Sequence, residues 1–138
     1  MSAFTEREIE YLRGQRLGRL ATVNAKGEPH VVPVAFRYNE EMDAIDIGGH
    51  NFARSKKYRD ARDTGRAAFV VDDVELRPWR ARGVEVRGRA EVLGEGGEEI
   101  GPGFDADVIR IFPERIVEWG LGSDAYRPNS RSVGEESA

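Results

Sequence analysis

Apolar and polar residues alternate along most of this chain with the two-residue period of half-buried β-strands, and turn residues separate the runs. The clearest alternation covers residues 84–93, in which Val84, Val86, Ala90 and Val92 share one face. Further strands are predicted over residues 17–24, 30–38, 42–48 and 66–72, and a last strand or pair of strands over residues 108–112 and 115–119. Strands at such short spacing favour a small antiparallel β-barrel with two or three helices.

Two segments have helical rather than β patterns. Thr5-Glu6-Arg7-Glu8 fits a capping box, with Thr5 as N-cap and Glu8 at the third helical position. Ile9 and Leu12 then give one apolar face, and Gly14 is a stop signal, so a short amphipathic helix is predicted over residues 6–14. A second helix is predicted to start in the basic segment that begins at Arg54.

Pro33 interrupts the second predicted strand. Proline has no backbone N–H to give to a β-ladder, so the strand at this point should lie at a sheet edge, at a bulge or beside a bound ligand. Between other strands, residues 77–83 are predicted to be a loop. Residues 94–103 have the glycines of a dinucleotide-binding loop, but no helix follows and their three glutamates would repel phosphate, so a surface loop is predicted.

The length of 138 residues fits one domain with a substantial core. We expect residues 1–122 to form that domain and residues 123–138 to be a polar tail, loose unless a partner chain holds it. Cysteine is absent, which excludes disulfides and thiolate metal sites, and His30 and His50 are the only imidazoles, so no metal site is expected. The acidic residues at 40–46 lack calcium-loop spacing and are predicted to lie on a solvated hairpin.

Composition and charge limit the partners of the protein. A sequence pI of 5.3 argues against general nucleic-acid binding. The first residues are acidic where a signal peptide has a basic and then an apolar run, and no apolar stretch approaches the ~20 residues that span a bilayer. We therefore expect a cytoplasmic protein without a membrane or nucleic-acid partner.

One basic segment stands out in this acidic chain. Residues 49–62 carry five Lys or Arg against the single acid Asp60, a local charge of +4 in a chain whose net charge is −4. A strand that ends at Gly48-Gly49 feeds this segment, so its basic residues should lie at a helix start. The unpaired N–H groups and dipole of a helix start attract phosphate, and neighbouring Lys or Arg strengthen the attraction. The alternative is a solvated basic helix face.

The chain lacks the motifs of an enzyme that carries its own chemistry. It has no Gly-x-Ser-x-Gly elbow, no cysteine nucleophile, no metal-ligand cluster and no Walker loop. An enzyme of this kind would take its chemistry from an organic cofactor, and a cofactor with phosphates needs a basic binding site.

Five stretches together identify a family. They are Arg19-Leu-Ala-Thr-Val, Gly27-Glu-Pro-His-Val-Val-Pro-Val, Asn51-Phe-Ala-Arg-Ser-Lys-Lys-Tyr-Arg-Asp, residues 79–91 and residues 109–121. In this order they resemble the split-barrel flavoproteins of the pyridoxamine 5′-phosphate oxidase superfamily, and within it the small actinobacterial branch that uses the deazaflavin coenzyme F420. The resemblance extends over residues 17–121.

The resemblance implies a mainly β split barrel of the FMN-binding-protein type with a few α-helices. It also implies a homodimer with the cofactor in a cleft between the subunits. The basic clamp, as we call Arg54, Ser55, Lys56 and Lys57, would bind the cofactor phosphate, and the backbone of Val32, Pro33 and Val34 would face the ring system.

A second basic patch favours F420 over FMN as the cofactor. F420 carries a phospholactyl-oligoglutamate tail, a longer polyanion than the single phosphate of FMN. The predicted loop at 77–83 places Arg80 and Arg82 beside Trp79, which would suit such a tail. The alternative is an ordinary charged surface loop, and Trp79 and Trp119 are each also typical of a barrel core.

These observations lead to three hypotheses for function. The first is an F420-dependent oxidoreductase that transfers a hydride to an activated double bond of a small organic substrate. The second is an FMN-dependent oxidase or reductase of the same fold, and the third is a non-catalytic flavin- or deazaflavin-binding protein. No catalytic residue is selected by the sequence: Tyr126, His50 or solvent could each supply a proton.

Overall fold

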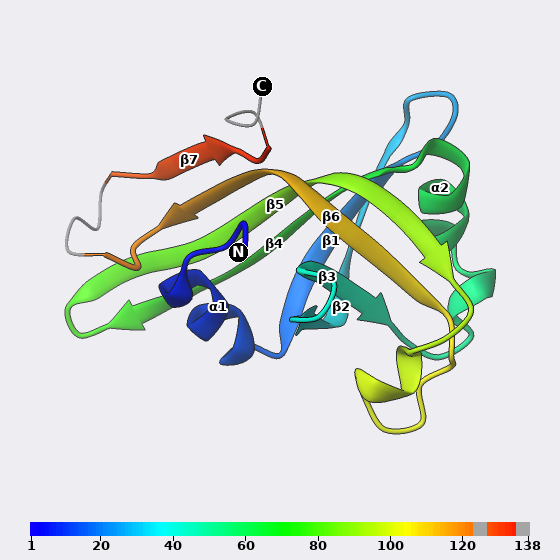
Figure 1. Ribbon diagram of the computed structural model, residues 1–138, viewed down its shortest axis with the longest axis horizontal. Coiled ribbons are helices and arrows are strands. Elements are labelled where there is room, and N and C mark those ends of the chain that lie inside the picture. The colour runs from blue at the N-terminus through cyan, green and yellow to red at the C-terminus, as the bar shows by residue number, and fades with distance from the viewer. Residues whose placement is uncertain (123–126, 135–138) are drawn as a thin grey trace.

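The computed structural model describes residues 1–122 and 127–134, and this part of the chain folds mainly into β-strands (Figure 1). The strands are β1 (Leu17–Val23), β2 (Pro29–Asn39), β3 (Ala44–Gly48), β4 (Arg66–Leu76), β5 (Trp79–Leu93), β6 (Val108–Trp119) and β7 (Asn129–Ser132). The α-helices are α1 (Glu6–Arg13) and α2 (Lys56–Thr64), and the short 3-10 helices are η1 (Phe52–Arg54) and η2 (Gly97–Glu99).

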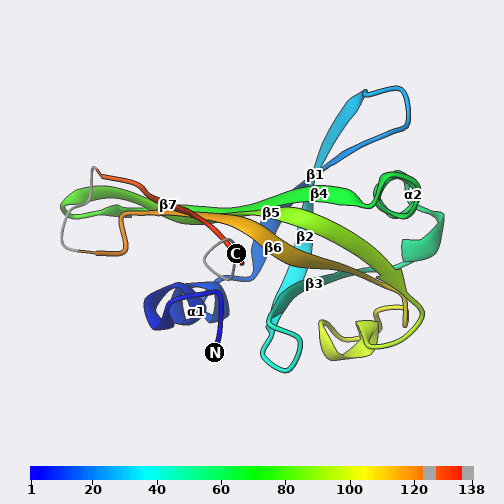
Figure 2. The ribbon, with the colours of Figure 1, turned by 45° about the horizontal axis from the view of Figure 1, so that its top comes forward.

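The strands form one antiparallel sheet in the order β3-β2-β1-β4-β5-β6-β7. Because β3 pairs with β6 as well as with β2, strands β1 to β6 close into a barrel, and β7 lies outside it along β6. The two α-helices lie towards opposite ends of the molecule (Figure 2). The predicted small antiparallel barrel with helices is therefore confirmed.

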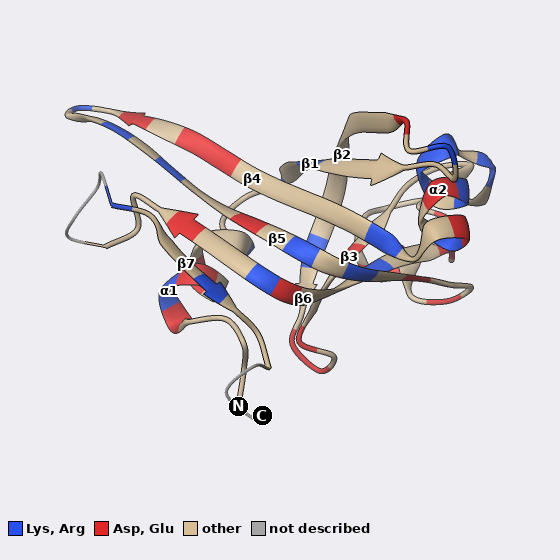
Figure 3. Cartoon of the chain, turned by 90° about the horizontal axis from the view of Figure 1, so that it is seen from above, with Lys and Arg blue, Asp and Glu red and all other residues tan. Residues whose placement is uncertain are grey.

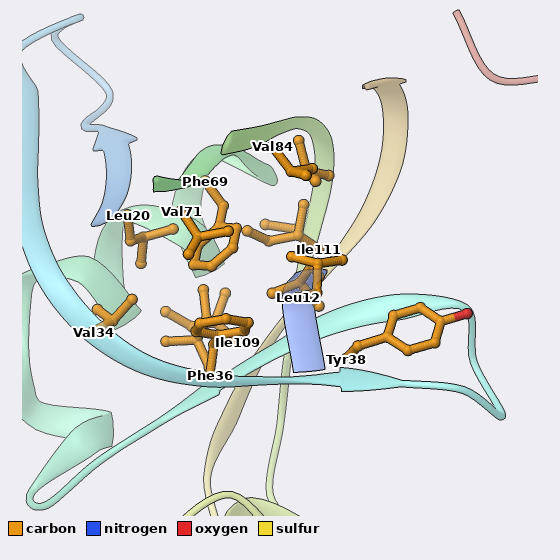
Figure 4. Packing of buried hydrophobic residues seen from close by; sticks show 14 of the residues in the cluster. Leu12, Leu20, Val34, Phe36, Tyr38, Phe69, Val71, Val84, Ile109 and Ile111 are labelled. Atoms are coloured by element: carbon orange, nitrogen blue, oxygen red, sulfur yellow. The ribbon is translucent and has the colours of Figure 1, made fainter. Parts of the chain in front are cut away.

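The core forms because alternate residues of each strand are apolar and point inward. Leu20, Phe69 and Val84 come from three adjacent strands, and each is at most 1% exposed. Figure 4 shows these side chains packed together with Phe36 and Ile109 from the other side of the barrel. Each side chain of this kind contributes roughly 1.5–3 kcal/mol by leaving water.

Strand β6 accommodates a proline without a break. The sequence left open one strand or two over this segment, and the structure has a single strand that pairs with β5, with a register shift between Arg87 and Gly88. Pro113 lies opposite Gly88, where a Cβ atom would be only 2.0 Å from the carbonyl oxygen of Phe112. The glycine permits the close approach, and the irregularity falls where proline has no N–H to donate.

Beyond the barrel, β4 and β5 continue as a two-stranded arm, which we define as residues 72–83 (Figure 1). The predicted loop at 77–83 is therefore wrong, because β5 begins at Trp79 and only two residues connect the strands. The charged residues that suggested a loop form cross-strand pairs instead. Asp73 lies in register with Arg82, and opposite charges in register stabilise a β-ribbon.

Part of the predicted loose tail is also a strand. Residues 129–132 form β7 and pair with residues 115–118 of β6. Arg131 donates hydrogen bonds to both carboxylate oxygens of Glu8, at 2.6 and 2.8 Å, and to the carbonyl oxygen of Ala3 at 2.7 Å. The prediction of a loose tail is wrong for these residues, because an ion pair joins them to the first helix.

Helix α1 begins with the predicted capping box. Thr5 Oγ1 accepts a hydrogen bond from the N–H of Glu8 at 3.2 Å, and Glu8 Oε1 accepts one from the N–H of Thr5 at 2.9 Å. Gly14 caps the C-terminal end, as expected. Neither α1 nor any other helix in the described ranges is long and apolar enough to cross a membrane.

The barrel closes across a buried ion pair between β3 and β6. Arg110 Nε donates to Asp46 Oδ1 at 2.8 Å, and Asn39 Nδ2 donates to Asp46 Oδ2 at 2.9 Å. Asp46 is only 1% exposed, and its hydrogen bond holds the pKa of the Arg110 guanidinium above its ordinary value. A buried carboxylate therefore depends on these two donors.

We predict that Asp46→Ala lowers the free energy of unfolding by roughly 3–5 kcal/mol, because the change leaves the largely buried Arg110 charge without its partner. Chemical denaturation of the two proteins measures the difference. The double variant Asp46→Ala, Arg110→Met should regain a large part of the loss. If the double variant is no more stable than Asp46→Ala, the unpaired charge is not the cause.

Candidate functional site

The candidate site begins where strand β3 ends. The last residue pair between β2 and β3 joins Ala35 to Gly48, so residues 29–34 of β2 keep β1 as their one neighbouring strand. Pro33 lies in this stretch, which confirms the expectation of a sheet edge. Val34 is buried and Val32 half-buried, while Pro33 is exposed on the outer side. One edge of β2 therefore presents backbone groups that no strand in the described part of the chain covers.

A tightly held turn connects β3 to helix α2. Asn51 has φ 51°, a left-handed conformation that asparagine tolerates better than most residues. Asp105 holds the turn from outside: its carboxylate accepts from the N–H of Phe52 at 3.0 Å, and its own N–H donates to the carbonyl oxygen of Gly49 at 3.0 Å. The exposed ring of His50 lies edge-on against Phe104, with ring centroids 5.2 Å apart.

Ser55 starts helix α2 rather than standing free as a ligand. Its hydroxyl oxygen accepts from the N–H of Tyr58 at 3.3 Å, and the hydroxyl donates to the carbonyl oxygen of Phe52 at 2.6 Å. This N-cap satisfies one N–H of the first turn, but helical geometry gives the N–H groups of Lys56 and Lys57 no acceptor inside the helix. These two donors and the helix dipole make the start of α2 favourable for an anion.

The three cations of the basic clamp differ in what they contact. Arg54 is exposed, and its guanidinium has no bonding partner within the described ranges. Lys56 Nζ lies 3.4 Å from the carboxylate of Asp60. Lys57 is half-buried with its ammonium 5.3 Å from the centre of the Phe52 ring, and burial lowers the pKa of this group. Arg54 and Lys57 therefore keep uncompensated charge, whereas that of Lys56 is largely balanced.

Asp60 is a functional candidate that the sequence analysis missed. It is only 4% exposed, and its carboxylate accepts a hydrogen bond from Thr22 Oγ1 of β1 at 2.9 Å. The carboxylate thus holds helix α2 against strand β1 and also positions the ammonium group of Lys56. The spacing of four residues between Lys56 and Asp60 was the available signal, because such residues are neighbours on a helix face.

The second predicted basic patch, Arg80 and Arg82 beside Trp79, does not lie near the basic clamp of the same chain. The arm and helix α2 lie at opposite ends of the molecule (Figure 3). Arg82 donates to Asp73 at 2.7 and 3.0 Å, a pairing that raises the pKa of its guanidinium. Arg80 donates to the carbonyl oxygens of Gly120 and Gly122 at 3.2 and 2.9 Å. Both arginines therefore have structural partners inside their own chain.

The two tryptophans also differ from each other. Trp79 is 65% exposed on the arm, so the expectation that it belongs to the core is wrong. Trp119 lies partly buried over Gly83, where a Cβ atom would be 2.5 Å from its ring. Of the proton donors considered, His50 lies beside the clamp on the β3–α2 turn, and Tyr126 lies outside the described residues.

Comparison with known families supports the fold and the kind of site. The family model described as pyridoxamine 5′-phosphate oxidase matches residues 4–132. The chain belongs to this family. This protein is similar in sequence to the 5a,11a-dehydrotetracycline/5a,11a-dehydrooxytetracycline reductase of Streptomyces rimosus. The two are 50% identical over 122 residues, which cover 88% of this chain and 86% of the reductase.

Solved structures share the fold of this family member at low sequence identity. A conserved hypothetical protein from Mycobacterium tuberculosis has a TM-score of 0.69 at 21% identity, covering 99% of this chain and 96% of that one. An FAD-binding protein from Mycobacterium smegmatis has a TM-score of 0.63 at 16% identity, covering 95% and 100%. These likenesses show the split-barrel fold, and the family and the reductase relative support a small-molecule oxidoreductase.

We predict that Arg82→Ala destabilises this family member by about 1 kcal/mol, because a partly exposed charge-assisted pair with Asp73 is lost. Thermal unfolding without ligand measures the effect. Arg77→Ala is the matched control, since Arg77 lies exposed at the tip of the same arm and should leave the melting temperature unchanged. Equal melting temperatures for both variants would contradict a structural role for Arg82.

Proposed function

We propose that this protein is a reductase that uses the deazaflavin coenzyme F420 to deliver a hydride to an activated carbon–carbon double bond in a small organic substrate. The observation that carries the proposal is the 50% identity to a dehydrotetracycline reductase over most of both chains. The described residues hold no cluster of side chains that could bind a metal ion. The cofactor would supply the electrons, and the protein would bind, orient and exclude water.

The start of α2 fits the phosphate of such a cofactor. The exposed Arg54 and the N–H groups of Lys56 and Lys57 can each donate to phosphate oxygens, and Lys57 adds a charge in a partly desolvated position. Ser55 contributes by starting the helix, and Lys56 by its fixed ammonium next to Asp60. The clamp then acts as an assembly in which Arg54 is the residue most free to move onto a ligand.

The free edge of β2 fits the ring system. Backbone N–H and C=O groups between Val32 and Val34 can pair with the polar edge of a flavin or deazaflavin, as an additional strand would. The edge and the clamp both adjoin Gly48, since β2 loses its pairing with β3 there and the chain turns towards α2. One extended cofactor could therefore contact both.

An apolar outer side of the sheet supports a homodimer. Within the described ranges, five of the seven exposed large hydrophobic residues lie on this side by strand register, namely Leu17, Val31, Val74, Leu76 and Trp79. The charges among them are already paired, as in Arg19 with Asp72 at 3.0 Å and Arg87 with Glu85 at 3.0 Å. Such a surface can be buried by a second copy without leaving an unpaired charge.

The second copy would also decide the role of the arm. Because the arm lies far from the clamp of its own chain, Trp79, Arg80 and Arg82 could border the cofactor only across a dimer (Figure 3). In that arrangement Trp79 offers a free aromatic face, and Arg80 would add charge because its present partners are neutral carbonyl oxygens. The charge of Arg82 is balanced by Asp73, so Arg82 would have to leave this partner to bind an anion.

FMN is the alternative cofactor for the same site. The structural likeness to an FAD-binding protein favours flavin chemistry in general. A single phosphate would need only the clamp, whereas the oligoglutamate tail of F420 would need further cations. Comparing the affinity of the purified protein for F420 and for FMN therefore separates the two hypotheses.

We predict that the protein binds F420 more tightly than FMN, and a titration followed by tryptophan fluorescence measures both affinities. We also predict that reduced F420 is consumed when an enone substrate is added. Arg54→Ala should weaken cofactor binding by roughly 1.5–3 kcal/mol, because one charge-assisted interaction is lost, with unchanged melting of the free protein.

Arg62→Ala is the matched control, because Arg62 is an exposed arginine of the same helix that pairs with its neighbour Asp63. It should leave affinity within a factor of two. Tighter binding of FMN than F420 would assign the site to FMN. Binding without any turnover would favour the non-catalytic hypothesis, and an unaltered Arg54→Ala affinity would remove the clamp from the site.

For the dimer, we predict that Val31→Glu produces a monomer at micromolar concentration, because a charge at the centre of an apolar interface would be buried without a partner. Sedimentation velocity measures the state of each protein. Met42→Glu is the control, since Met42 is also exposed but lies at the turn between β2 and β3. A wild-type monomer, or dissociation by both variants alike, would overturn the proposed interface.

A further inference from the structure

A buried carboxyl group at the end of β6 is not explained by its ion pair. Glu118 is only 2% exposed, and Arg7 contacts its Oε1 atom from a side chain that is itself 48% exposed. The second oxygen, Oε2, is buried and has no hydrogen-bond partner among residues 1–122 and 127–134. An ionised carboxylate would keep charge on a buried oxygen to which no described residue donates a hydrogen bond.

A second buried carboxyl group lies against the first. Glu8 of α1 is fully buried, and its carboxyl is close enough to that of Glu118 for one to hydrogen-bond to the other. The oxygens of Glu8 are already occupied by acceptor roles towards Arg131 and the N–H of Thr5. The missing element of the pair is a donor, and a proton on Glu118 would supply it.

We propose that a proton held on Glu118 and donated to Glu8 fastens two elements near the ends of the described chain to the barrel, and that loss of this proton as pH rises loosens them. The elements concerned are α1 and β7, which the Glu8–Arg131 ion pair joins into one unit that we call the strap. The step is a simple acid dissociation: the proton passes from Glu118 to water, and two carboxylates then face each other.

The charged neighbours of the pair act in both directions: Arg7 favours the carboxylate form of Glu118, whereas burial and Glu8 oppose it more strongly. Helix α1 presents Arg7 and Glu8 to Glu118, and β7 presents Arg131, whose guanidinium is committed to Glu8 and Ala3. Arg127 lines the same opening beside Glu118, and the register partner on β5 is the apolar Val84. Burial, followed by the contact with Glu8, raises the pKa of Glu118 above its ordinary value. Burial acts to raise the pKa of Glu8 as well, but hydrogen bonds with Arg131, Glu118 and Thr5 outweigh it and bring that pKa below its ordinary value.

The sign of the pH dependence follows from these two shifts. A raised pKa gives stability that is complete below the unfolded value near 4.5 and is lost as pH rises through the folded pKa of Glu118. A lowered pKa gives stability that is lost as pH falls through the folded pKa of Glu8. The strap should therefore be held most firmly between the two titrations.

Infrared spectroscopy of the whole chain tests the proton directly. At a pH where exposed glutamates are ionised, the wild-type protein should retain the carbonyl absorption of one protonated carboxylic acid, and Glu118→Gln should lack it. Glu114→Gln is the matched control, since Glu114 lies on the same strand but is exposed and pairs with Arg66. Absence of the absorption in the wild-type protein overturns the proposal, even if the variant fails to fold.

Hydrogen exchange tests the loosening. After correction for intrinsic base catalysis, opening of β7 in the wild-type protein should increase by up to about tenfold per pH unit above the titration of Glu118, as one linked proton requires. Glu118→Gln keeps a donor for Glu8 but cannot ionise, so its opening should not change with pH. The same pH profile in wild type and Glu118→Gln would overturn the proposal.

Discussion

The barrel closes through β3, a strand of five buried residues, and the point where this strand ends determines where a site can form. Its neighbour β2 has eleven residues, so six of them extend past Gly48 with one edge uncovered. The chain itself must leave the sheet at Gly48, and it turns there into η1 and α2. A short closing strand thus creates, in one place, both a free backbone edge and a helix start that carries basic residues.

The charges of this protein have to be judged by their partners rather than by their number. The basic segment around α2 has a local charge of +4, but Lys56 lies against Asp60 and Arg62 against Asp63. On the arm, Arg82 is paired with Asp73. Arg54 differs from all of these, because it is exposed without a bonding partner in the described ranges. Within the basic segment, pairing therefore leaves uncompensated positive charge on Arg54 and Lys57, beside the first turn of α2.

Local patterns in the sequence predicted what depends on local interactions. The capping box of α1, the alternation of β5 and the edge position of Pro33 all follow from residues close together in the chain. Residues 77–83 of the arm were predicted to be a loop, because their charges are matched only once β4 lies beside β5. The strand β7 was missed for the same reason: its anchor Arg131 meets Glu8 across 123 positions. Contacts between residues so far apart in the chain produce no periodic pattern in the sequence. The burial of Asp60 could not be predicted for the same reason, because its hydrogen-bond partner Thr22 lies on strand β1.

The free edge of β2 has a consequence for how proteins of this shape diverge. Its donors and acceptors belong to the peptide groups, so amino-acid replacement between residues 29 and 34 alters the contour of the opening but hardly its polar pattern. Proline is the one replacement that deletes a donor, and positions 29 and 33 already carry it. Proteins with such an edge can therefore change the side chains around the opening, and with them the compounds that fit, while the hydrogen-bonding pattern of the backbone stays the same.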